Sequence, residues 1–114
     1  MPYLSIQTNT GLNESDKPAL LKQASALVAQ ALGKPEQYVM VAIEPQKPMC
    51  FAGTDAPCAY LELKSIGLPG SRTTELSAIL AEFMESATGI DKGRIYTEFS
   101  DAPRAFWGWN GSTF

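Results

Sequence analysis

The sequence predicts an α/β fold in which a strand–helix–strand unit occurs twice and forms a four-stranded mixed sheet with two helices on one face. Segments rich in β-forming residues alternate with two segments whose apolar residues recur at helical spacing. The second half of the chain also resembles the first: when Gly67 is aligned with Gly11, the apolar helix positions coincide and Gly89 falls on Gly33. A repeated βαβ unit explains both observations.

The length of the chain, 114 residues, allows one domain at about 100 to 200 residues per domain. We therefore expect a single domain, 1–114, with pseudo-repeat halves at about 1–57 and 58–114. Apolar residues make up 45% of the chain, which excludes disorder. Charged residues make up only 18%, below the ~25% of an average domain, as expected if another copy covers part of the surface.

The first unit begins with a strand at 2–8, because these residues have no helical period and are rich in β-formers, and 9–11 form a turn. A helix follows, with Asn13 and Ser15 as candidate N-caps, and Gly33 ends it. Its apolar stripe consists of Leu20, Leu21, Ala24, Leu27, Val28, Ala31 and Leu32.

The second strand is expected at 38–44, where alternate residues are apolar and a proline follows. The apolar face of this strand consists of Val39, Val41 and Ile43. Prolines and a glycine make 45–57 a predicted loop, with a short extended piece at Cys50 and Phe51.

The second unit repeats this order with a strand at 59–65, a helix at about 71–88 that ends at Gly89, and a strand at 94–99. A short aromatic segment, 106–109, lies near the end of the chain. The apolar stripe of the helix is Leu76, Ile79, Leu80, Phe83, Met84 and Ala87. With both helices on one face, the other face of the sheet has no cover, and we expect it to pack against neighbouring subunits.

Composition excludes several classes of function. The net charge of −3 provides no basic face for nucleic acid, so we expect no nucleic-acid partner. Because the chain has no histidine, a Ser-His-Asp or Cys-His pair, a histidine base and a histidine-containing zinc site are impossible within it. Cys50 and Cys58 have the spacing of neither a redox pair nor a zinc site, and we expect both to be small buried hydrophobic residues. No metal or organic cofactor is expected.

No segment resembles a targeting sequence. The first ten residues lack the charged and apolar regions of a signal peptide, and no stretch approaches the ~18 apolar residues of a membrane span. We therefore expect a soluble, cytoplasmic protein with no membrane partner.

Pro2 is the first candidate for chemistry. Removal of Met1, which is usual when a small residue follows, would expose a secondary amine. An α-amine has a pKa of about 7.7 to 8.0, and burial or a nearby cation lowers that pKa. Such an amine is a general base at neutral pH that needs no histidine. Alternatively, Pro2 is simply the first residue of an edge strand.

Short motifs that occur in order along the whole chain carry a family resemblance. They are Pro2, Gly33-Lys34-Pro35 with Gln37-Tyr38, Pro57-Cys58-Ala59, Ser65-Ile66-Gly67, Arg94-Ile95-Tyr96, and Gly108-Trp109-Asn110 with Ser112-Thr113-Phe114. Each is weak by itself, and together they are specific. The chain thus resembles the macrophage migration inhibitory factor family of the tautomerase superfamily. The resemblance implies a homotrimer whose sheets enclose a central channel.

The resemblance also implies a cofactor-independent keto-enol tautomerase of the phenylpyruvate or dopachrome type, in which the Pro2 amine is the general base. Lys34 would bind the substrate carboxylate and help keep the amine neutral, and the backbone of Ile66 would contribute a hydrogen bond. Tyr96 would come from the adjacent subunit, so the active site would lie at a subunit interface. The aromatic lining would consist of Tyr38, Trp109 and Phe114. Enolisation of an aromatic 2-keto acid needs this combination of neutral base, cation and apolar wall.

Some positions depart from the family pattern. Glu98 stands where the family commonly has a pocket asparagine, two residues after the tyrosine. A carboxylate there would raise the pKa of the proline and repel an anionic substrate, unless Lys34 or Arg104 pairs with it. Trp107 stands where an aliphatic residue is common and Tyr3 where methionine is common, which predicts a narrower pocket mouth.

Other interpretations remain open. Lys34, near a helix C-terminus, would also complement the helix macrodipole, and Tyr96 and Trp109 would also serve as core or interface aromatics. The alternative function is a cytokine-like signalling or receptor-binding protein with a residual tautomerase pocket, secreted without a signal peptide. Thiol redox chemistry at Cys58 is disfavoured, because only the first cysteine of the C-x-x-C motif of some members is present.

Overall fold

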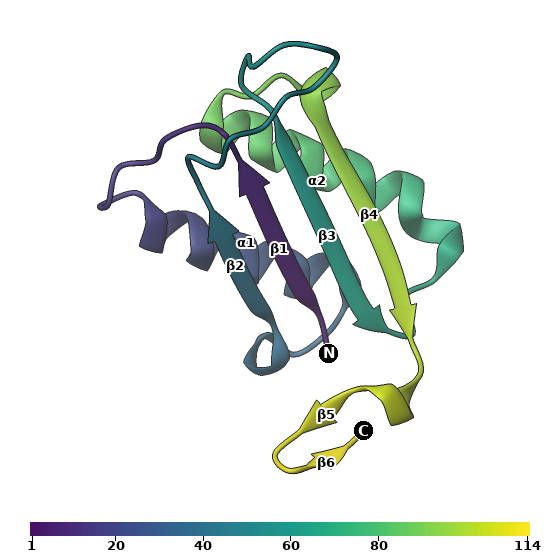
Figure 1. Ribbon diagram of the computed structural model, residues 1–114. Helices are drawn as coiled ribbons and strands as arrows, with labels where there is room; N and C mark the ends of the chain where they lie inside the picture. Colours follow the sequence, from purple (N-terminus) through teal and green to yellow (C-terminus); the bar gives the residue numbers. More distant parts are fainter.

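The computed structural model describes residues 1–114 and contains a four-stranded sheet with the order β2–β1–β3–β4 (Figure 1). β1 (Tyr3–Thr8) is parallel to β2 (Met40–Glu44), and β3 (Ala59–Ile66) is parallel to β4 (Ile95–Ala102). At the centre of the sheet, β1 and β3 are antiparallel. The predicted mixed sheet built from two βαβ units is therefore confirmed.

The crossover helices α1 (Lys17–Leu32) and α2 (Thr73–Thr88) lie behind the same face of the sheet in Figure 1. A parallel strand pair needs such a crossover, because its strands cannot be joined by a tight turn. Both helices end as predicted at glycines in the left-handed conformation, Gly33 with a φ of 64° and Gly89 with a φ of 77°. Glycine adopts this conformation without the clash that a Cβ atom would cause.

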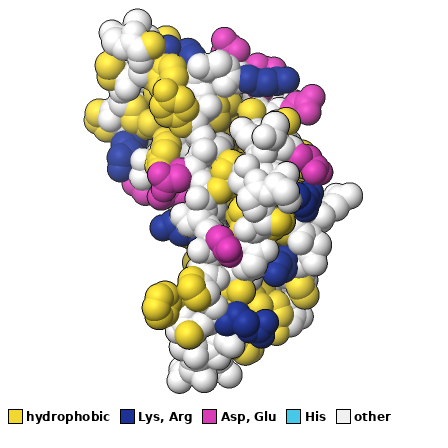
Figure 2. All heavy atoms as spheres, turned by 90° about the vertical axis from the view of Figure 1, so that its right-hand side faces the viewer, with side chains coloured by type: hydrophobic (Ala, Val, Ile, Leu, Met, Phe, Trp, Pro, Cys, Tyr) yellow, Lys and Arg dark blue, Asp and Glu magenta, His cyan; other side chains and the backbone are white.

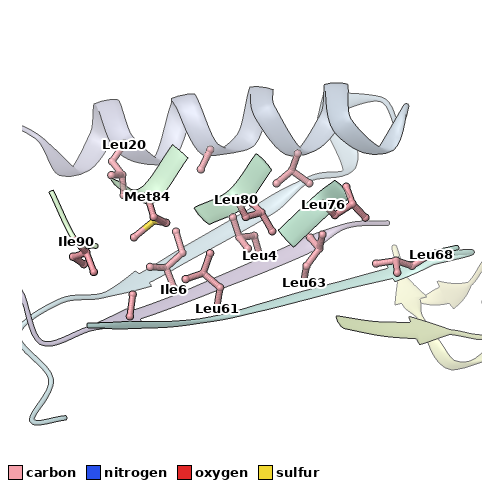
Figure 3. Close-up of a cluster of buried hydrophobic side chains, with 13 residues drawn as sticks. Leu4, Ile6, Leu20, Leu61, Leu63, Leu68, Leu76, Leu80, Met84 and Ile90 are labelled. Atoms are coloured by element: carbon pink, nitrogen blue, oxygen red, sulfur yellow. The ribbon is translucent and has the colours of Figure 1, made fainter. Parts of the chain in front are cut away.

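The hydrophobic core fills the space between the helices and the sheet. Each helix buries residues spaced four apart, one side of its apolar stripe, as in the series Leu76, Leu80 and Met84 of α2. Figure 3 shows side chains from both helices pointing toward those of the central strands, where Leu4 lies opposite Leu63. The full cluster is Leu4, Ile6, Leu20, Ala24, Val28, Ala59, Leu61, Leu63, Leu68, Leu76, Leu80, Met84 and Ile90.

The opposite face of the sheet carries no helix (Figure 1). Because side chains alternate along a strand, this face holds the residues between the core positions. The register places Tyr3 opposite Lys64 on it, and Glu62 opposite Glu98. Polar, charged and apolar side chains are thus mixed on this face, and its packing against neighbouring subunits stays a prediction.

Several element boundaries differ from the sequence prediction. The second strand begins at Met40 rather than at residue 38, because Glu36–Tyr38 form a 3₁₀ turn instead. The fourth strand, predicted to end at residue 99, continues to Ala102, in register with the whole of β3. These boundaries depend on strand pairing, which a single-strand pattern does not reveal.

Two predictions about single residues are wrong. The N-cap of α1 is Asp16, which makes no side-chain capping bond, so neither Asn13 nor Ser15 is the cap. Asn13 instead accepts hydrogen bonds at its backbone carbonyl, in the turn before the helix. Cys50 is exposed, while Cys58 is buried as predicted. Cys50 is exposed because it lies in a loop that projects beyond the sheet.

The loop at 45–57 is held to the body of the protein by Arg94. Its guanidinium donates hydrogen bonds to the carbonyls of Pro57, Ala56, Phe51 and Thr54 at 2.9, 3.1, 3.2 and 3.4 Å. The predicted extended piece is confirmed at Phe51, which forms an isolated bridge with Thr54.

The end of the chain forms a separate hairpin beyond the sheet (Figure 1). After a 3₁₀ turn at Arg104–Phe106, β5 (Gly108–Trp109) pairs with β6 (Ser112–Thr113). In Figure 1 the hairpin lies at the end of the molecule where β1 begins. The predicted aromatic segment therefore lies near the N-terminus.

Candidate active site

Pro2 lies immediately before β1, at the end of the sheet that faces the hairpin. Its carbonyl accepts a hydrogen bond from the backbone N–H of Met40 at 3.0 Å, which fixes it to β2. Its side chain is less than 2% exposed. With Met1 attached, the nitrogen of Pro2 is an amide, and only removal of Met1 would make it basic.

A cavity of about 450 Å³, here called the aromatic pocket, lies beside Pro2. The rings of Trp109 and Phe114 stack with centroids 5.6 Å apart. The ring of Tyr38 meets them edge-on, with its centroid 5.5 Å from that of Trp109 and 6.0 Å from that of Phe114. The three residues predicted to form an aromatic lining therefore line one cavity. Tyr3 and Trp107 line the same cavity.

A second cavity of about 470 Å³, here called the cationic pocket, contains the predicted carboxylate-binding residue Lys34. The Nζ of Lys34 donates a hydrogen bond to the carbonyl of Ile66 at 3.2 Å, so that Ile66 positions the ammonium group. The lining residues are Lys34, Ile66, Gly67, Asp101, Ala102, Pro103 and Arg104. Arg104 connects the two cavities, because its Nε donates to the carbonyl of Phe114 at 3.4 Å.

The electrostatic environment at the start of β1 favours a neutral amine. Partial burial lowers the pKa of the terminal amine, here carried by Met1, below its ordinary value of 8.0, and the positive charges of Lys34 and Arg104 lower it further. Both effects disfavour the protonated form. An amine on Pro2 would stand one residue further along the chain.

Two predicted site residues do not join this site within one chain. Tyr96 and Glu98 lie on β4 and line neither cavity. The ring of Tyr96, 63% exposed, packs edge-on against Phe51 with centroids 4.8 Å apart. Glu98 lies beside Glu62 in the register and forms no ion pair with Lys34 or any other residue of the chain.

Exposed apolar side chains mark the two ends of this edge of the sheet. Figure 2 shows the molecule from the side of β4, with hydrophobic side chains gathered at the upper left and again toward the lower end. The large hydrophobic residues that are most exposed are Tyr96 on β4, Phe106 and Trp109 in the terminal segment, and Met40 on β2 at the opposite edge of the sheet. These surfaces are of the kind that subunit contacts cover.

Two residues that line these cavities have no role in the site predicted from the sequence, Lys64 and Arg104. Lys64 lines the aromatic pocket, and strand alternation would have placed it on the same face as Tyr3, its partner in the register. The sequence suggests Arg104 only as a partner of Glu98, because nothing local shows that the fold brings it into the same cavity as Lys34.

The structure contains no cluster of three or more cysteine, aspartate or glutamate side chains arranged to hold a metal ion. None of its helices combines the length and the apolar character needed to cross a membrane.

Comparison with known proteins identifies the family. A sequence model described as macrophage migration inhibitory factor matches residues 1–114. The chain belongs to the macrophage migration inhibitory factor family. A homolog from Brugia malayi is 43% identical over 115 aligned positions, which cover 100% of this chain and 99% of the relative. The mouse factor, from Mus musculus, is 36% identical with the same coverage.

Solved structures of this family have the same fold. The crystal structure of the homologue from Prochlorococcus marinus superimposes with a TM-score of 0.92 at 43% identity, covering 98% of each chain. The factor from Trichinella spiralis gives a TM-score of 0.90 at 36% identity, covering 98% of this chain and 99% of the other. The predicted resemblance, and with it membership of the tautomerase superfamily, is therefore confirmed.

Proposed function

We propose that the protein is a cofactor-independent keto-enol tautomerase acting on small aromatic 2-keto acids, with the amine of Pro2 as general base after removal of Met1. The observation that carries the proposal is the placement of a terminal amine with a lowered pKa beside an aromatic pocket and a cationic pocket. Membership of the tautomerase superfamily supports it.

The proposed reaction moves one proton and changes no oxidation state. The amine of Pro2 takes the proton from the carbon beside the keto group, and the electron pair of that C–H bond forms a carbon–carbon double bond. The electron pair of the C=O double bond moves to the oxygen, which receives the proton from the protonated amine of Pro2, so that the enol hydroxyl forms and the amine is neutral again. Reversal of these steps returns the proton to carbon. Because only the neutral amine accepts a proton, the lowered pKa increases the active fraction at neutral pH.

The two cavities fit the two ends of such a substrate. An aryl ring would lie against Tyr38, Trp109 and Phe114, which form an apolar wall. The carboxylate would bind Lys34, whose Nζ donates one hydrogen bond, to Ile66, and has further N–H groups for a ligand. The positive charge would also stabilise the negative charge that develops on the enolate oxygen.

The proposal includes a homotrimer with its active sites at subunit interfaces. Tyr96 and Glu98 lie outside the cavities of their own chain, and the side chain of Tyr96 is exposed. A neighbouring subunit would bring both residues to the pocket of Pro2, and the effect of the Glu98 carboxylate on the rate would appear there. Light scattering tests this assembly, and a stable monomer at micromolar concentration would contradict it.

The catalytic proposal is tested by phenylpyruvate tautomerisation between about pH 5 and 9, using protein shown by intact mass to lack Met1. We expect the rate to rise with pH through an apparent pKa below that of a free α-amine, and to collapse in Pro2→Gly. Protein that retains Met1 is the matched control, because its Pro2 nitrogen is an amide, and it should be inactive. Equal turnover with and without Met1 would refute the proline base.

A second candidate function is cytokine-like signalling through a receptor, including secretion without a signal peptide. It is favoured by the relatives' names, since the chain is similar to mouse macrophage migration inhibitory factor along its whole length. The two functions separate in Pro2→Gly: binding to cell-surface receptors should persist in this variant, whereas tautomerase turnover should not.

A further inference from the structure

The cationic pocket contains two cationic side chains whose hydrogen-bond donors are only partly used. Both Lys34 and Arg104 line it, and neither belongs to the ion pairs of the structure, which all involve other residues. Lys34 bonds only to a backbone carbonyl, and so does Arg104. The two terminal nitrogens of Arg104 have no hydrogen-bond partner at all. Two cations therefore face one cavity with donors to spare.

The acidic groups nearby form no ion pair with these two cations within the chain. Asp101 also lines the cavity, but its Oδ1 accepts a hydrogen bond from the backbone N–H of Leu68 at 3.0 Å, and it forms no ion pair. Glu98 lies opposite Glu62 in the strand register, on the open face of the sheet. Like charges that share a site repel each other, and a bound anion relieves this repulsion.

The local backbone holds Arg104 at the junction of the two cavities. It begins the 3₁₀ turn after β4, where the N–H of Phe106 bonds to the carbonyl of Pro103 at 2.9 Å and that of Trp107 to the carbonyl of Arg104 at 3.3 Å. The bond from its Nε to Phe114 orients the guanidinium relative to the aromatic pocket. The planar guanidinium fork matches the two oxygens of a carboxylate.

We propose that Lys34 and Arg104 together bind substrates with two carboxylates, so that the protein accepts 2-keto diacids in addition to aromatic 2-keto monoacids. The proposal rests on the tautomerase function proposed above and specifies its substrate class. Lys34 binds the carboxylate attached to the keto carbon. Arg104 binds the second carboxylate, on the carbon that loses its proton, and so helps to place that carbon near Pro2.

Oxaloacetate and its 4-ethyl ester test this assignment, because they share one 2-keto acid skeleton and differ by one negative charge. Their keto-enol interconversion is followed by ultraviolet absorbance, with protein that lacks Met1. In Arg104→Ala we expect kcat/KM for oxaloacetate to fall by about 10- to 100-fold, as loss of a charged hydrogen-bond partner does, and kcat/KM for the ester to fall by less than about threefold.

Two further variants control for charge and chemistry. Arg104→Lys keeps the charge without the fork, and we expect it to recover part of the oxaloacetate activity. Lys92→Ala removes one positive charge from an exposed 3₁₀ turn at the other end of β4 and should leave kcat/KM for both substrates unchanged.

Equal losses of kcat/KM for both substrates in Arg104→Ala would overturn the proposal. It would also be overturned if Glu98→Gln raised oxaloacetate turnover while Arg104→Ala left it unchanged, because Glu98 of a neighbour would then neutralise Arg104.

A binding measurement separates this proposal from the catalytic one. Calorimetry with malonate and monoethyl malonate requires no turnover and uses Pro2→Gly protein. Tighter binding of malonate that disappears in the double variant with Arg104→Ala would support the two-cation site even if Pro2 were not the base. Equal binding of the two compounds would refute the site, while loss of phenylpyruvate turnover in Pro2→Gly would still support the proline base.

Discussion

The Arg94 anchor of the loop at 45–57 allows a prediction of stability whose size follows from the structure. The guanidinium of Arg94 donates to four backbone carbonyls of the loop and its carbon Cζ lies 5.1 Å from the centroid of the Phe51 ring. Arg94→Ala removes all of these interactions together. The variant should lower the free energy of unfolding and loosen the loop, without disturbing the core between helices and sheet.

The expected magnitude follows from the exposure of each bond. A hydrogen bond to a charged group contributes roughly 1.5–3 kcal/mol when shielded, and a cation–π contact at an exposed site contributes about 0.5–1 kcal/mol. Among the four acceptors only the carbonyl of Phe51 is reached by a partly buried bond, and water can replace the other three. Because neighbouring interactions do not add, we expect a total loss of about 1–3 kcal/mol.

Urea unfolding at a fixed protein concentration measures this loss, and hydrogen exchange locates it. The amides of Phe51 and Thr54, which bond to each other's carbonyls, should lose protection in Arg94→Ala. Arg94→Lys keeps the charge but loses the fork, so its free energy of unfolding should lie between those of the wild type and the alanine variant. Unchanged stability together with unchanged exchange at these two amides would refute the anchoring role of Arg94.

Three further predictions concern the core, the buried polar contacts and the site. Met84→Ala should lower the free energy of unfolding, measured in urea, by about 2–5 kcal/mol, because Met84 is 0% exposed. Met84→Leu nearly conserves the volume and should cost less than about 1.5 kcal/mol. Equal losses in the two variants would contradict a closely packed core. Thr8→Val should lower the free energy of unfolding by about 1–3 kcal/mol in the same assay, because the Thr8 hydroxyl donates a hydrogen bond to the buried carbonyl of Cys58 at 2.7 Å. An unchanged free energy of unfolding would mean that water reaches this carbonyl. Lys34→Ala should move the pH midpoint of the phenylpyruvate rate upward. The charge of Lys34 lowers the pKa of the terminal amine, so its removal favours the protonated, inactive form of the base. A midpoint that stays the same or falls would exclude this coupling.

The pattern of the fold could be predicted from the sequence because its signals are local. Apolar spacing located both helices, and alternation located the faces of strands such as Ala59–Ile66. Gly33 and Gly89 ended the helices as expected. Repetition of the unit then led to the mixed sheet, since few topologies connect two such units without crossing.

The sequence by itself therefore determined the order of elements, their buried faces and the family, and it singled out Pro2 and Lys34. Only the tertiary structure decided which side chains meet. The terminal hairpin brings Trp109 and Phe114 beside Pro2, and the turn after β4 brings Arg104 into the cavity of Lys34. These contacts join residues far apart in the chain, and they depend on strand order and register rather than on any local spacing. For the same reason Tyr96, with its motif intact, lies away from Pro2 within the chain, because β4 is an edge strand separated from β1 by β3.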